Sequence, residues 1–462
     1  MSSSQTGTLI HRPAFAFHIM QPGLRNTLVI AGDAMLAGPP DRAGVVARLV
    51  STFGAHGAWM DEVAQQAVDA FASRWDATQA DELTPLLANA PAFLAALGSD
   101  TPPEIIRLVR RPPAQRPPPL PLAHIALPQL PTLRDLADWL ELNDNDLSWL
   151  ATRWRVEPGE AASPLHHYTY HAREKRDGRH RLIERPKPLL RFVQHRLLHG
   201  LLDRVPPHDA AHGFRRGRNI VSYAAPHADK PLVIRLDLTD FFASITQARV
   251  HAVFHSLGYP LAVARALTAL STNRVPARVL TSGGLRGKFD WSEQQRLRAR
   301  HLPQGASTSP ALANLCAFRL DTRLAALARS LEANYTRYAD DLAFSGTARL
   351  QRVADRLPLW VAAIALEEGF TVQARKTRVM PRGTRQHLAG VVVNRHPNLA
   401  RDQFDKLKAL LTNCVRHGPV SQNRDGRADF RASLAGHVAH AAMLNPARGA
   451  KLQAIYARID WN

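Results

Sequence analysis

Residues 335–345 read Tyr-Thr-Arg-Tyr-Ala-Asp-Asp-Leu-Ala-Phe-Ser and set two adjacent carboxylates between aromatic and apolar residues. This pattern predicts a strand, a tight turn and a second strand, with Asp340 and Asp341 at the turn. Adjacent carboxylates repel each other, so they are stable where water solvates them or a divalent cation neutralises them. A solvated turn is the ordinary interpretation of an Asp-Asp pair, and the neighbouring segments decide between the two.

A second acidic strand lies upstream. Residues 231–242 read Pro-Leu-Val-Ile-Arg-Leu-Asp-Leu-Thr-Asp-Phe-Phe, an apolar run that ends in Asp237. Such a run predicts a buried strand that delivers a carboxylate to the end of a sheet. Asp237 and Asp340 would then serve oxygen-ligated cations, because Mg²⁺ takes one or two carboxylates and completes its shell with substrate phosphates and water. Two such ions, roughly 3.5–4 Å apart, stabilise the attacking and leaving oxygens of phosphoryl transfer.

A glycine loop lies between the two acidic segments. Residues 302–310 read Leu-Pro-Gln-Gly-Ala-Ser-Thr-Ser-Pro, in which Gly305 lets the backbone approach a ligand and the Ser/Thr group with Pro310 predicts a helix start. The three segments, in this order, resemble the palm of reverse transcriptases. The resemblance runs from about Thr132 to the end of the chain and is greatest to the bacterial retron and retron-like enzymes.

Composition agrees with a nucleic-acid partner. The 462 residues predict at least two domains, and a net charge of +20 favours a polyanion, although a GC-rich genome can also produce an Arg-rich chain. Cys316 and Cys414 are the only cysteines, which argues against a disulfide scaffold or a Cys-based zinc site. No apolar run reaches the roughly 18–20 residues of a membrane span, and residues 1–5 begin no secretory signal. We therefore expect a cytoplasmic bacterial protein with no membrane partner.

The resemblance implies an α+β fold of the right-hand polymerase type, with fingers, an antiparallel-sheet palm and a thumb, plus a helical N-terminal extension. The predicted divisions are a helical extension of unknown role at 1–100, a Pro-rich basic linker at 101–131, fingers and N-terminal helices at 132–230, a palm with the catalytic Asp residues at 231–394, and a basic helical thumb at 395–462. The linker is interpreted as an extended spacer, with an RNA-contacting strap as the alternative. We further predict an irregular basic insertion at 281–300, one long helix at 311–331 and a strand pair at 370–379.

The nucleotide-binding residues are predicted from several segments. Residues 168–186 predict a basic β-hairpin with an Asp-Gly turn, and Arg181 and Lys175 on it are candidates to hold the triphosphate of an incoming nucleotide. The resemblance implies that Phe242 excludes a 2′-OH and so selects dNTPs over NTPs. It adds Gln304 and Gly305 to the dNTP site, and Lys376 as a candidate proton donor to pyrophosphate. Asp240 is predicted to support the site without binding the cation.

A second group of residues is predicted to bind nucleic acid. The loop at 212–220, His-Gly-Phe-Arg-Arg-Gly-Arg-Asn-Ile, offers backbone donors and arginines to phosphates. The residues assigned to this role are His212, Gly213, Phe214, Arg215, Arg218, Tyr338 and Gly390. The basic helices after residue 400 are predicted to contact the backbone of a template–primer duplex.

The resemblance implies an RNA-directed DNA polymerase whose nucleophile is a primer hydroxyl. Asp237 and Asp340 would hold two Mg²⁺, the Leu238 carbonyl would be a further ligand, and Asp341 would support the site or coordinate more weakly. By analogy with retrons, the partners would be a structured noncoding RNA, the dNTPs, the branched RNA-linked single-stranded DNA (msDNA) made from them, and an effector protein from the same locus. The biological role would be defence against phage.

Two departures from the retron pattern keep other functions open. Tyr223 stands where retron enzymes often carry Asn, although His227 is retained, and residues 388–390 keep only the Gly of their Val-Thr-Gly. Another bacterial defence class, such as an abortive-infection enzyme that polymerises without a template, is the first alternative. A non-catalytic RNA-binding subunit is opposed by the intact acids, a group II intron enzyme by the short C-terminal remainder, and a cyclase-like nucleotidyltransferase by Phe242 and the Pro-Gln-Gly loop.

Overall fold

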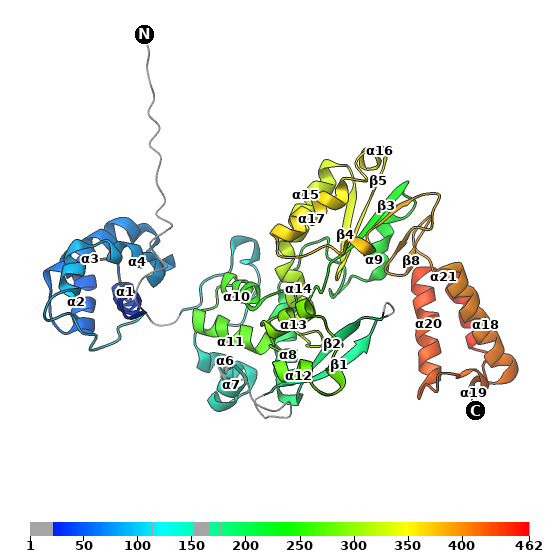
Figure 1. Ribbon diagram of the computed structural model, residues 1–462, viewed down its shortest axis with the longest axis horizontal. Coiled ribbons are helices and arrows are strands. Elements are labelled where there is room, and N and C mark those ends of the chain that lie inside the picture. The colour runs from blue at the N-terminus through cyan, green and yellow to red at the C-terminus, as the bar shows by residue number, and fades with distance from the viewer. Residues whose placement is uncertain (1–21, 112–113, 152–165, 176–177, 462) are drawn as a thin grey trace, which may run out of the picture. The chain divides into compact units, whose positions relative to one another are not determined.

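The computed structural model describes residues 22–111, 114–151, 166–175 and 178–461. The chain divides into two compact units, Met1–Pro113 and Ala114–Asn462 (Figure 1). Within the part of the chain that the structure describes, no helix is long and apolar enough to cross a membrane.

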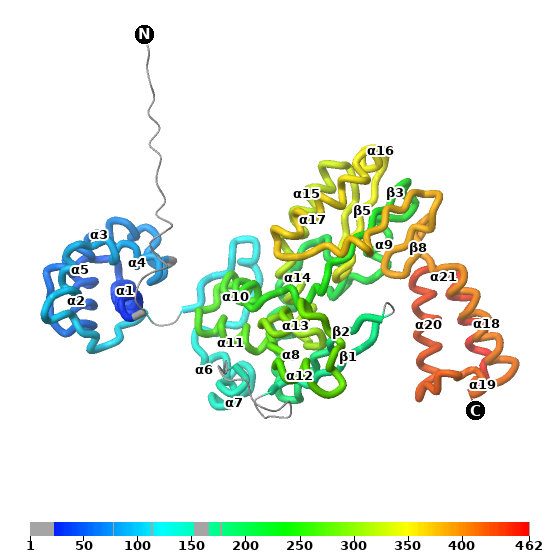
Figure 2. The backbone as a smooth tube through the Cα atoms, in the orientation of Figure 1, coloured from blue at the N-terminus to red at the C-terminus, as the bar shows by residue number. Residues whose placement is uncertain are grey.

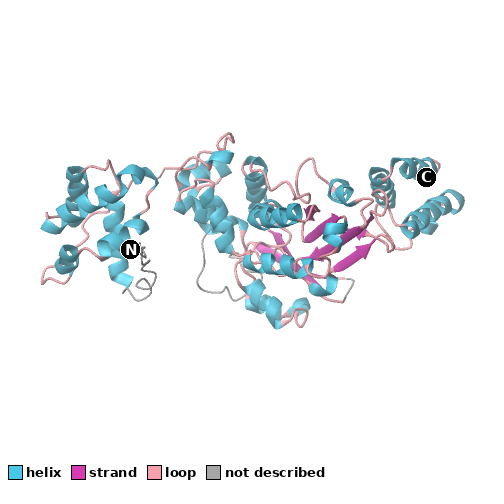
Figure 3. Ribbon diagram, turned by 90° about the horizontal axis from the view of Figure 1, so that it is seen from above, coloured by secondary structure: helices cyan, strands magenta, loops and turns pink. Residues whose placement is uncertain are grey.

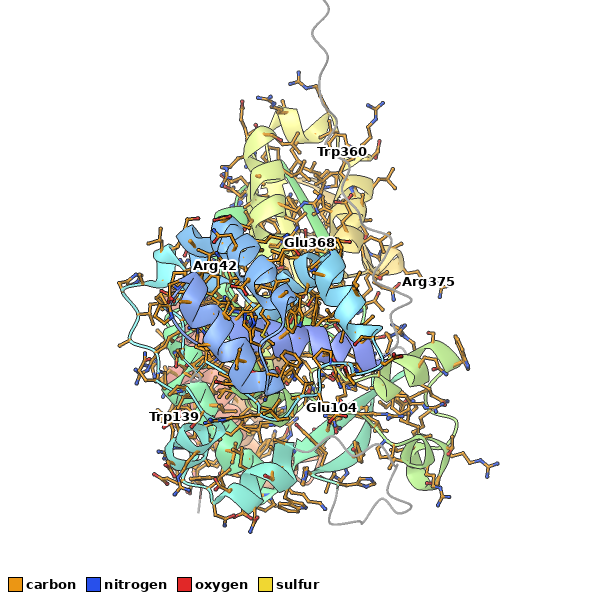
Figure 4. All side chains as sticks on the ribbon, turned by 90° about the vertical axis from the view of Figure 1, so that its left-hand side faces the viewer. Arg42, Glu104, Trp139, Trp360, Glu368 and Arg375 are labelled. Atoms are coloured by element: carbon orange, nitrogen blue, oxygen red, sulfur yellow. The ribbon has the colours of Figure 1, made fainter. Side chains whose placement is uncertain are left out.

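The first unit is helical, and its helices pack around one apolar core. Trp59 and Phe93 meet at its centre with ring centroids 4.3 Å apart. Asp41 caps α2 by accepting a hydrogen bond from the Gly44 N–H. Arg42, labelled in Figure 4, pairs with Asp61 at 2.9 Å and so joins α2 to α3. The elements are α1 (Pro22–Met35), α2 (Arg42–Phe53), α3 (Ala58–Phe71), a 3₁₀ turn (Ala72–Ala77), α4 (Ala80–Ala88) and α5 (Pro91–Leu97).

The Pro-rich stretch predicted as a linker is divided between the two units. On the N-terminal side, the Arg111 guanidinium donates to the Leu36 carbonyl at 2.8 Å, and Arg110 pairs with Asp33 at 3.3 Å. On the C-terminal side, Arg116 lies 3.0 Å from His255. The division between units therefore falls inside residues 101–131, and these three arginines of the stretch make contacts within their own unit.

The second unit is built on a four-stranded antiparallel sheet with strand order β4-β5-β3-β6. Its strands are β3 (Leu232–Asp237), β4 (Asn334–Tyr338), β5 (Asp341–Gly346) and β6 (Arg378–Pro381). Alternate residues face opposite sides, so Ile234 and Phe344 enter the main helical core while Val233 and Ala343 pack on a smaller cluster with Tyr223. Helices flank the magenta strands in Figure 3. This α+β arrangement with antiparallel sheets agrees with the fold class predicted from sequence.

The β1–β2 hairpin and helices α6 to α9 precede β3 in the chain, and α10 and α11 follow it. The hairpin pairs β1 (Tyr168–Glu174) with β2 (His180–Pro186), as the Asp-Gly turn predicted. The helices are α6 (Leu133–Leu140), α7 (Asp144–Ala151), α8 (Pro188–Gly200), α9 (Ile220–Ala224), α10 (Gln247–Ser256) and α11 (Leu261–Ser271), with 3₁₀ turns at Leu202–Arg204 and Ala225–His227.

Three local predictions are wrong. The insertion expected to be irregular at 281–300 follows α12 (Ala277–Thr281) and contains a 3₁₀ turn (Gly283–Leu285) and α13 (Trp291–Arg298). The single helix expected at 311–331 is two, α14 (Ser309–Cys316) and α15 (Phe318–Ser330), because the backbone at Ala317 leaves the helical region at φ −87°, ψ 3°. Lys376, expected on a strand, lies instead on a 3₁₀ turn (Ala374–Lys376). The residue before this turn, Gln373, donates its N–H to the Asp237 carbonyl.

The remaining elements complete the second unit. Glu368, labelled in Figure 4, accepts a hydrogen bond from Arg323 and joins the end of α17 to α15. The C-terminal helices pack around Leu411, Leu434 and Leu452, and the helical prediction for this region agrees with them. The elements are α16 (Ala348–Gln351), α17 (Leu357–Glu367), β7 (His387–Leu388), β8 (Val391–Val392), α18 (Arg401–His417), α19 (Pro419–Gln422), α20 (Phe430–Leu444) and α21 (Pro446–Tyr456).

Candidate active site

Three carboxylates meet at one end of the central sheet. β4 ends at Tyr338, the turn passes through Ala339 in the left-handed region at φ 56°, and β5 begins at Asp341. Asp341 lies opposite Asp237 in the antiparallel register, and the Asp340 carbonyl accepts a hydrogen bond from Leu238 N–H at 2.9 Å. The turn therefore brings together the acids that the sequence predicted to be neighbours.

The three carboxylates repel one another. Burial and the charge of Asp340 raise the pKa of Asp341 to about 7, and burial and the charge of Asp237 raise the pKa of Asp340. Two cations partly offset this charge: Lys376 Nζ lies 2.8 Å from Asp237 Oδ1, and Arg235 Nε lies 3.8 Å from Asp341 Oδ1. A further cation bound at this end of the sheet would stabilise the ionised carboxylates.

The donor set fits a hard divalent cation, because carboxylate oxygens are the ligands that Mg²⁺ prefers. Within the described ranges, no group of three or more His, Cys, Asp or Glu side chains is arranged to hold a metal. The acids could thus supply only part of a coordination shell. Mg²⁺ is usually bound in this way, through one or two carboxylates and the phosphates of a substrate.

A cavity of about 210 Å³ opens beside Asp237 and Asp340. Basic side chains from separate segments face it, which makes it a site for an anion next to the acids. Five of the six residues predicted to bind a nucleotide line this cavity, namely Lys175, Arg181, Phe242, Gln304 and Lys376. Residues that the sequence did not indicate also line it, among them Arg179, Phe289, Glu293, Arg296 and Gln373.

The two phenylalanines after β3 have different environments. Phe241 is buried and stacks on Phe370 with ring centroids 5.5 Å apart. Phe242 is half-buried and lines the cavity, where its ring lies 5.9 Å from that of Phe214. The core therefore anchors the first ring and leaves the second at the cavity wall, the position required for the predicted steric selection.

Gly305, the sixth predicted nucleotide residue, lies against the hairpin. Its φ is +130°, and a Cβ there would lie 2.8 Å from the Glu184 carbonyl oxygen, so only glycine allows this approach. Glu184 is fully buried: its N–H donates to the Gln304 carbonyl, and its carboxylate pairs with His301 at 2.9 Å. Burial alone would lower the pKa of His301, but the charge and hydrogen bond of Glu184 raise it. This buried pair fixes the loop to the hairpin, and the sequence did not indicate it.

Two residues predicted to bind nucleic acid, His212 and Gly213, lie against β4 and the turn that carries the acids: His212 N–H donates to the Arg337 carbonyl at 2.8 Å. His212 is buried, and burial with the charge of Arg218 lowers its pKa to about 4. A Cβ on Gly213 would lie 2.7 Å from the Ala339 backbone nitrogen. Glycine is needed there because the loop touches the turn that carries the acids.

The other predicted nucleic-acid residues are dispersed. Phe214 lines the cavity, and Arg215 lies 3.3 Å from Asp209. Arg218 is exposed on the same loop. Tyr338 ends β4 with its ring 5.6 Å from Tyr223, and Gly390 is exposed in the turn between β7 and β8 at φ 88°.

A buried ion pair that the sequence analysis missed holds the acid hairpin. Arg337 and Asp321 are both fully buried and are joined by two hydrogen bonds of 2.6 and 2.8 Å. Arg337 also donates to the carbonyl of Ala339, in the acid turn, at 3.1 Å. The available signal was an arginine in the middle of a predicted buried strand, since an isolated buried charge is costly and needs a partner.

The comparisons with known proteins agree with this geometry. Residues 173–393 match the family described as reverse transcriptase (RNA-dependent DNA polymerase), a range that contains β2, the residues that line the cavity and the three acids. This part of the chain is therefore similar to reverse transcriptase domains.

Within that class, the chain is similar to retron reverse transcriptases, and the resemblance predicted from sequence is confirmed. It is 40% identical over 288 residues to the retron Mx65 reverse transcriptase of Myxococcus xanthus, and the aligned region covers 62% of this chain and 64% of that protein. It is 36% identical over 337 residues to the retron Mx162 enzyme of the same species, covering 70% and 66%. It is 27% identical over 295 residues to the retron Ec86 enzyme of Escherichia coli, covering 63% and 80%. The chain thus spans slightly less than two thirds of the two Myxococcus relatives.

Proposed function

We propose that this chain is an RNA-directed DNA polymerase of the retron type. The observation that carries the proposal is the meeting of Asp237 and Asp340 at the rim of a basic cavity inside a reverse transcriptase domain. The proposal includes the right-hand layout, with fingers at 132–230, palm at 231–394 and thumb at 395–462. The hairpin and the Pro-Gln-Gly loop then form the nucleotide side of the site.

The acids are proposed to hold the catalytic cations. Asp237 and Asp340 are the main carboxylate ligands, the Leu238 carbonyl is a further ligand, and Asp341 supports them from the start of β5. Two Mg²⁺ ions, when bound, activate the primer hydroxyl and neutralise the triphosphate. Burial and repulsion by a neighbouring carboxylate raise the pKa values of Asp340 and Asp341, which supports this assignment because cation binding would relieve the repulsion.

The basic side chains of the cavity are proposed to orient the nucleotide. Arg181 and Lys175 bind the triphosphate from the hairpin, and Phe242 meets the sugar. Lys376 is the proposed proton donor to the pyrophosphate leaving group. Its ammonium lies at the cavity and 2.8 Å from Asp237, and so would be within reach of a phosphate held by a cation on the same carboxylate.

The partners are proposed by analogy with the retron relatives. They are a structured noncoding RNA, dNTPs and a branched RNA-linked DNA (msDNA) primed from a guanosine 2′-OH, with an effector protein from the same locus and a role in phage defence. An unbranched product from another defence class is the second candidate. It is favoured by Tyr223, which replaces the usual Asn and packs beside Tyr338 of the acid hairpin.

The nucleic acid that copurifies with the protein tests the proposal. The chain would be purified from a host carrying its native locus, beside the Asp340→Ala/Asp341→Ala variant, and the extracted nucleic acid treated with RNase and DNase separately. A discrete DNA that shortens on RNase treatment and is absent from the variant is the expected result. Unbranched DNA would favour the second candidate. RNA alone, with no DNA synthesis on a supplied template and primer, would contradict both.

A further inference from the structure

The segment between Asn273 and His301 is an insertion in the second unit, and its two ends lie side by side. Its two ends are joined by a pair of backbone hydrogen bonds, Asn273 N–H to the His301 carbonyl at 3.0 Å and the reverse at 2.9 Å. Both ends also hold the buried carboxylate of Glu184, since Asn273 Nδ2 lies 2.7 Å from Oε2 and His301 Nε2 lies 2.9 Å from Oε1. The insertion is thus fixed to β2 at its base.

The insertion has an apolar core of its own that it shares with the hairpin. Phe289 and Leu297 pack in it against Leu182 of β2, and Ala243, in the turn after β3, packs on the same cluster. Figure 2 shows α12 and α13 beside the β1–β2 hairpin. The insertion therefore connects the two segments that present Arg181 and Phe242 to the cavity.

One face of α13 forms a wall of the cavity. Phe289, Glu293, Arg296 and Leu297 all line it. Arg296 Nη2 donates to Asp240 Oδ2 at 2.7 Å, and its side chain is 36% exposed, so the pair is partly shielded from water. Besides the apolar contact of Ala243, Arg296 therefore joins the insertion to the turn that carries Phe242 by an ion pair.

Asp240 has an unusual backbone. Its φ is +44°, in the left-handed region that few non-glycine residues adopt, although Asp tolerates it better than most. The same turn is closed by the Ser244 N–H, which donates to the Asp240 carbonyl at 2.9 Å. An ion pair that holds the side chain of a residue in this conformation restricts the turn, and with it the ring of Phe242 two residues later.

We propose that Arg296 is a positioning residue for the incoming nucleotide, and that the cavity-lining residues of the insertion, Phe289, Glu293, Arg296 and Leu297, are a wall of the nucleotide site. By holding Asp240, Arg296 keeps Phe242 against the sugar of a deoxynucleoside triphosphate, and the insertion thereby sets the preference for a deoxyribose. This inference rests on the proposed polymerase function. It goes further in assigning sugar selectivity to a helix outside the acid strands and the hairpin.

Two readouts test the inference. Equilibrium binding of dATP and of ATP in the presence of Mg²⁺ would be measured by calorimetry, and KM and kcat for both would be measured by single-nucleotide incorporation on a supplied template–primer. The variants are Arg296→Ala, Arg296→Lys and Asp240→Asn, since Asn also tolerates the left-handed backbone. Arg298→Ala is the matched control, because Arg298 is exposed on the same helix and carries the same charge.

We expect Arg296→Ala to reduce the preference for dATP over ATP roughly fivefold to tenfold, the range of one ordinary hydrogen bond, because water partly screens this pair. The change should appear in KM more than in kcat. Asp240→Asn should act in the same direction, the double variant should be no worse than the stronger single one, and Arg296→Lys should recover part of the effect. Arg298→Ala should match the wild type.

Other outcomes would overturn the inference. An unchanged dATP preference in both Arg296→Ala and Asp240→Asn would remove it, and so would an equal change in Arg298→Ala. If the wild type incorporates no nucleotide but Arg296→Ala still changes the dATP preference in binding, the polymerase proposal fails while the nucleotide wall stands. If the wild type binds neither nucleotide, both fail.

Discussion

Replacing Arg337 by Met should destabilise the sheet unit by about 3–5 kcal/mol, the cost of breaking a buried ion pair from one side. Arg337 and Asp321 both have 0% exposed side chains, so Asp321 would be left charged in the interior. The Tyr335 hydroxyl, which donates to Asp321 Oδ1 at 2.8 Å, would remain as a hydrogen-bond partner. The loss should be measured by urea unfolding, with hydrogen exchange of peptides from β4 and α15 to assign the transition.

A second variant and a control make this prediction specific. Arg337→Met combined with Asp321→Leu removes both charges and should recover most of the lost stability. Arg349→Ala is the control, because Arg349 pairs with Glu332 at side-chain exposures of 51% and 67% and should cost less than about 1 kcal/mol. A loss below about 1 kcal/mol for Arg337→Met, or no recovery in the double variant, would refute the reasoning.

Three further predictions concern residues around the acid turn. His227 is buried between Ser345 and Thr336, and burial lowers its pKa to about 3 from an unfolded value of 6.5. The neutral imidazole therefore contributes stability above pH 6.5, and this contribution is lost as the pH falls toward 3. His227→Gln should reduce the pH slope of the unfolding free energy in that window by up to about 1.4 kcal/mol per pH unit, and an unchanged slope in urea titrations would contradict this. Gly213→Ala should displace the Ala339 backbone and lower polymerase activity in primer extension at least about tenfold. The control Gly436→Ala has open space around the new Cβ and should keep the wild-type activity. Equal activities of the two variants would argue against a close contact at Gly213. Gly305→Ala should lower the free energy of unfolding, measured by thermal denaturation, by at least about 1–3 kcal/mol, because the φ of Gly305 is +130° and the Glu184 carbonyl blocks a Cβ. A wild-type melting temperature would show that the loop can move.

Local pattern was sufficient to predict the acid strands. The alternation on either side of Asp340 and the apolar run before Asp237 specify β4, β5 and β3, and antiparallel pairing then brings the acids to one end of the sheet. The Asp-Gly turn specified the β1–β2 hairpin in the same way. In each case the side-chain period and the turn residues lie within about ten positions of each other.

Tertiary contacts explain most of what the sequence could not predict. Arg337 finds Asp321 sixteen positions away, and Glu184 finds His301 more than a hundred positions away, so no local pattern indicates either pair. The break between α14 and α15 falls at Ala317, a good helix former, so the packing of the two helices sets it.

The helix α13 could have been predicted. Asp290 accepts from the Glu293 N–H while the Glu293 carboxylate accepts from the Asp290 N–H, a capping box visible in the sequence as Asp-Trp-Ser-Glu. The prediction of an irregular basic insertion at 281–300 did not take this capping box into account. The cavity wall that this helix forms was missed for the same reason.

The central claim is that Asp237 and Asp340 serve DNA synthesis on an RNA template. Primer extension by the purified chain, with a synthetic RNA template, a DNA primer, dNTPs and Mg²⁺, tests it most directly. We expect template-dependent extension by the wild type. Asp340→Asn should lower the extension rate by about a thousandfold or more, the scale of a lost metal ligand. Asp425→Asn, at an exposed position, should leave the rate unchanged. Extension by Asp340→Asn at the wild-type rate, or no extension by the wild type on any supplied RNA template, would contradict it.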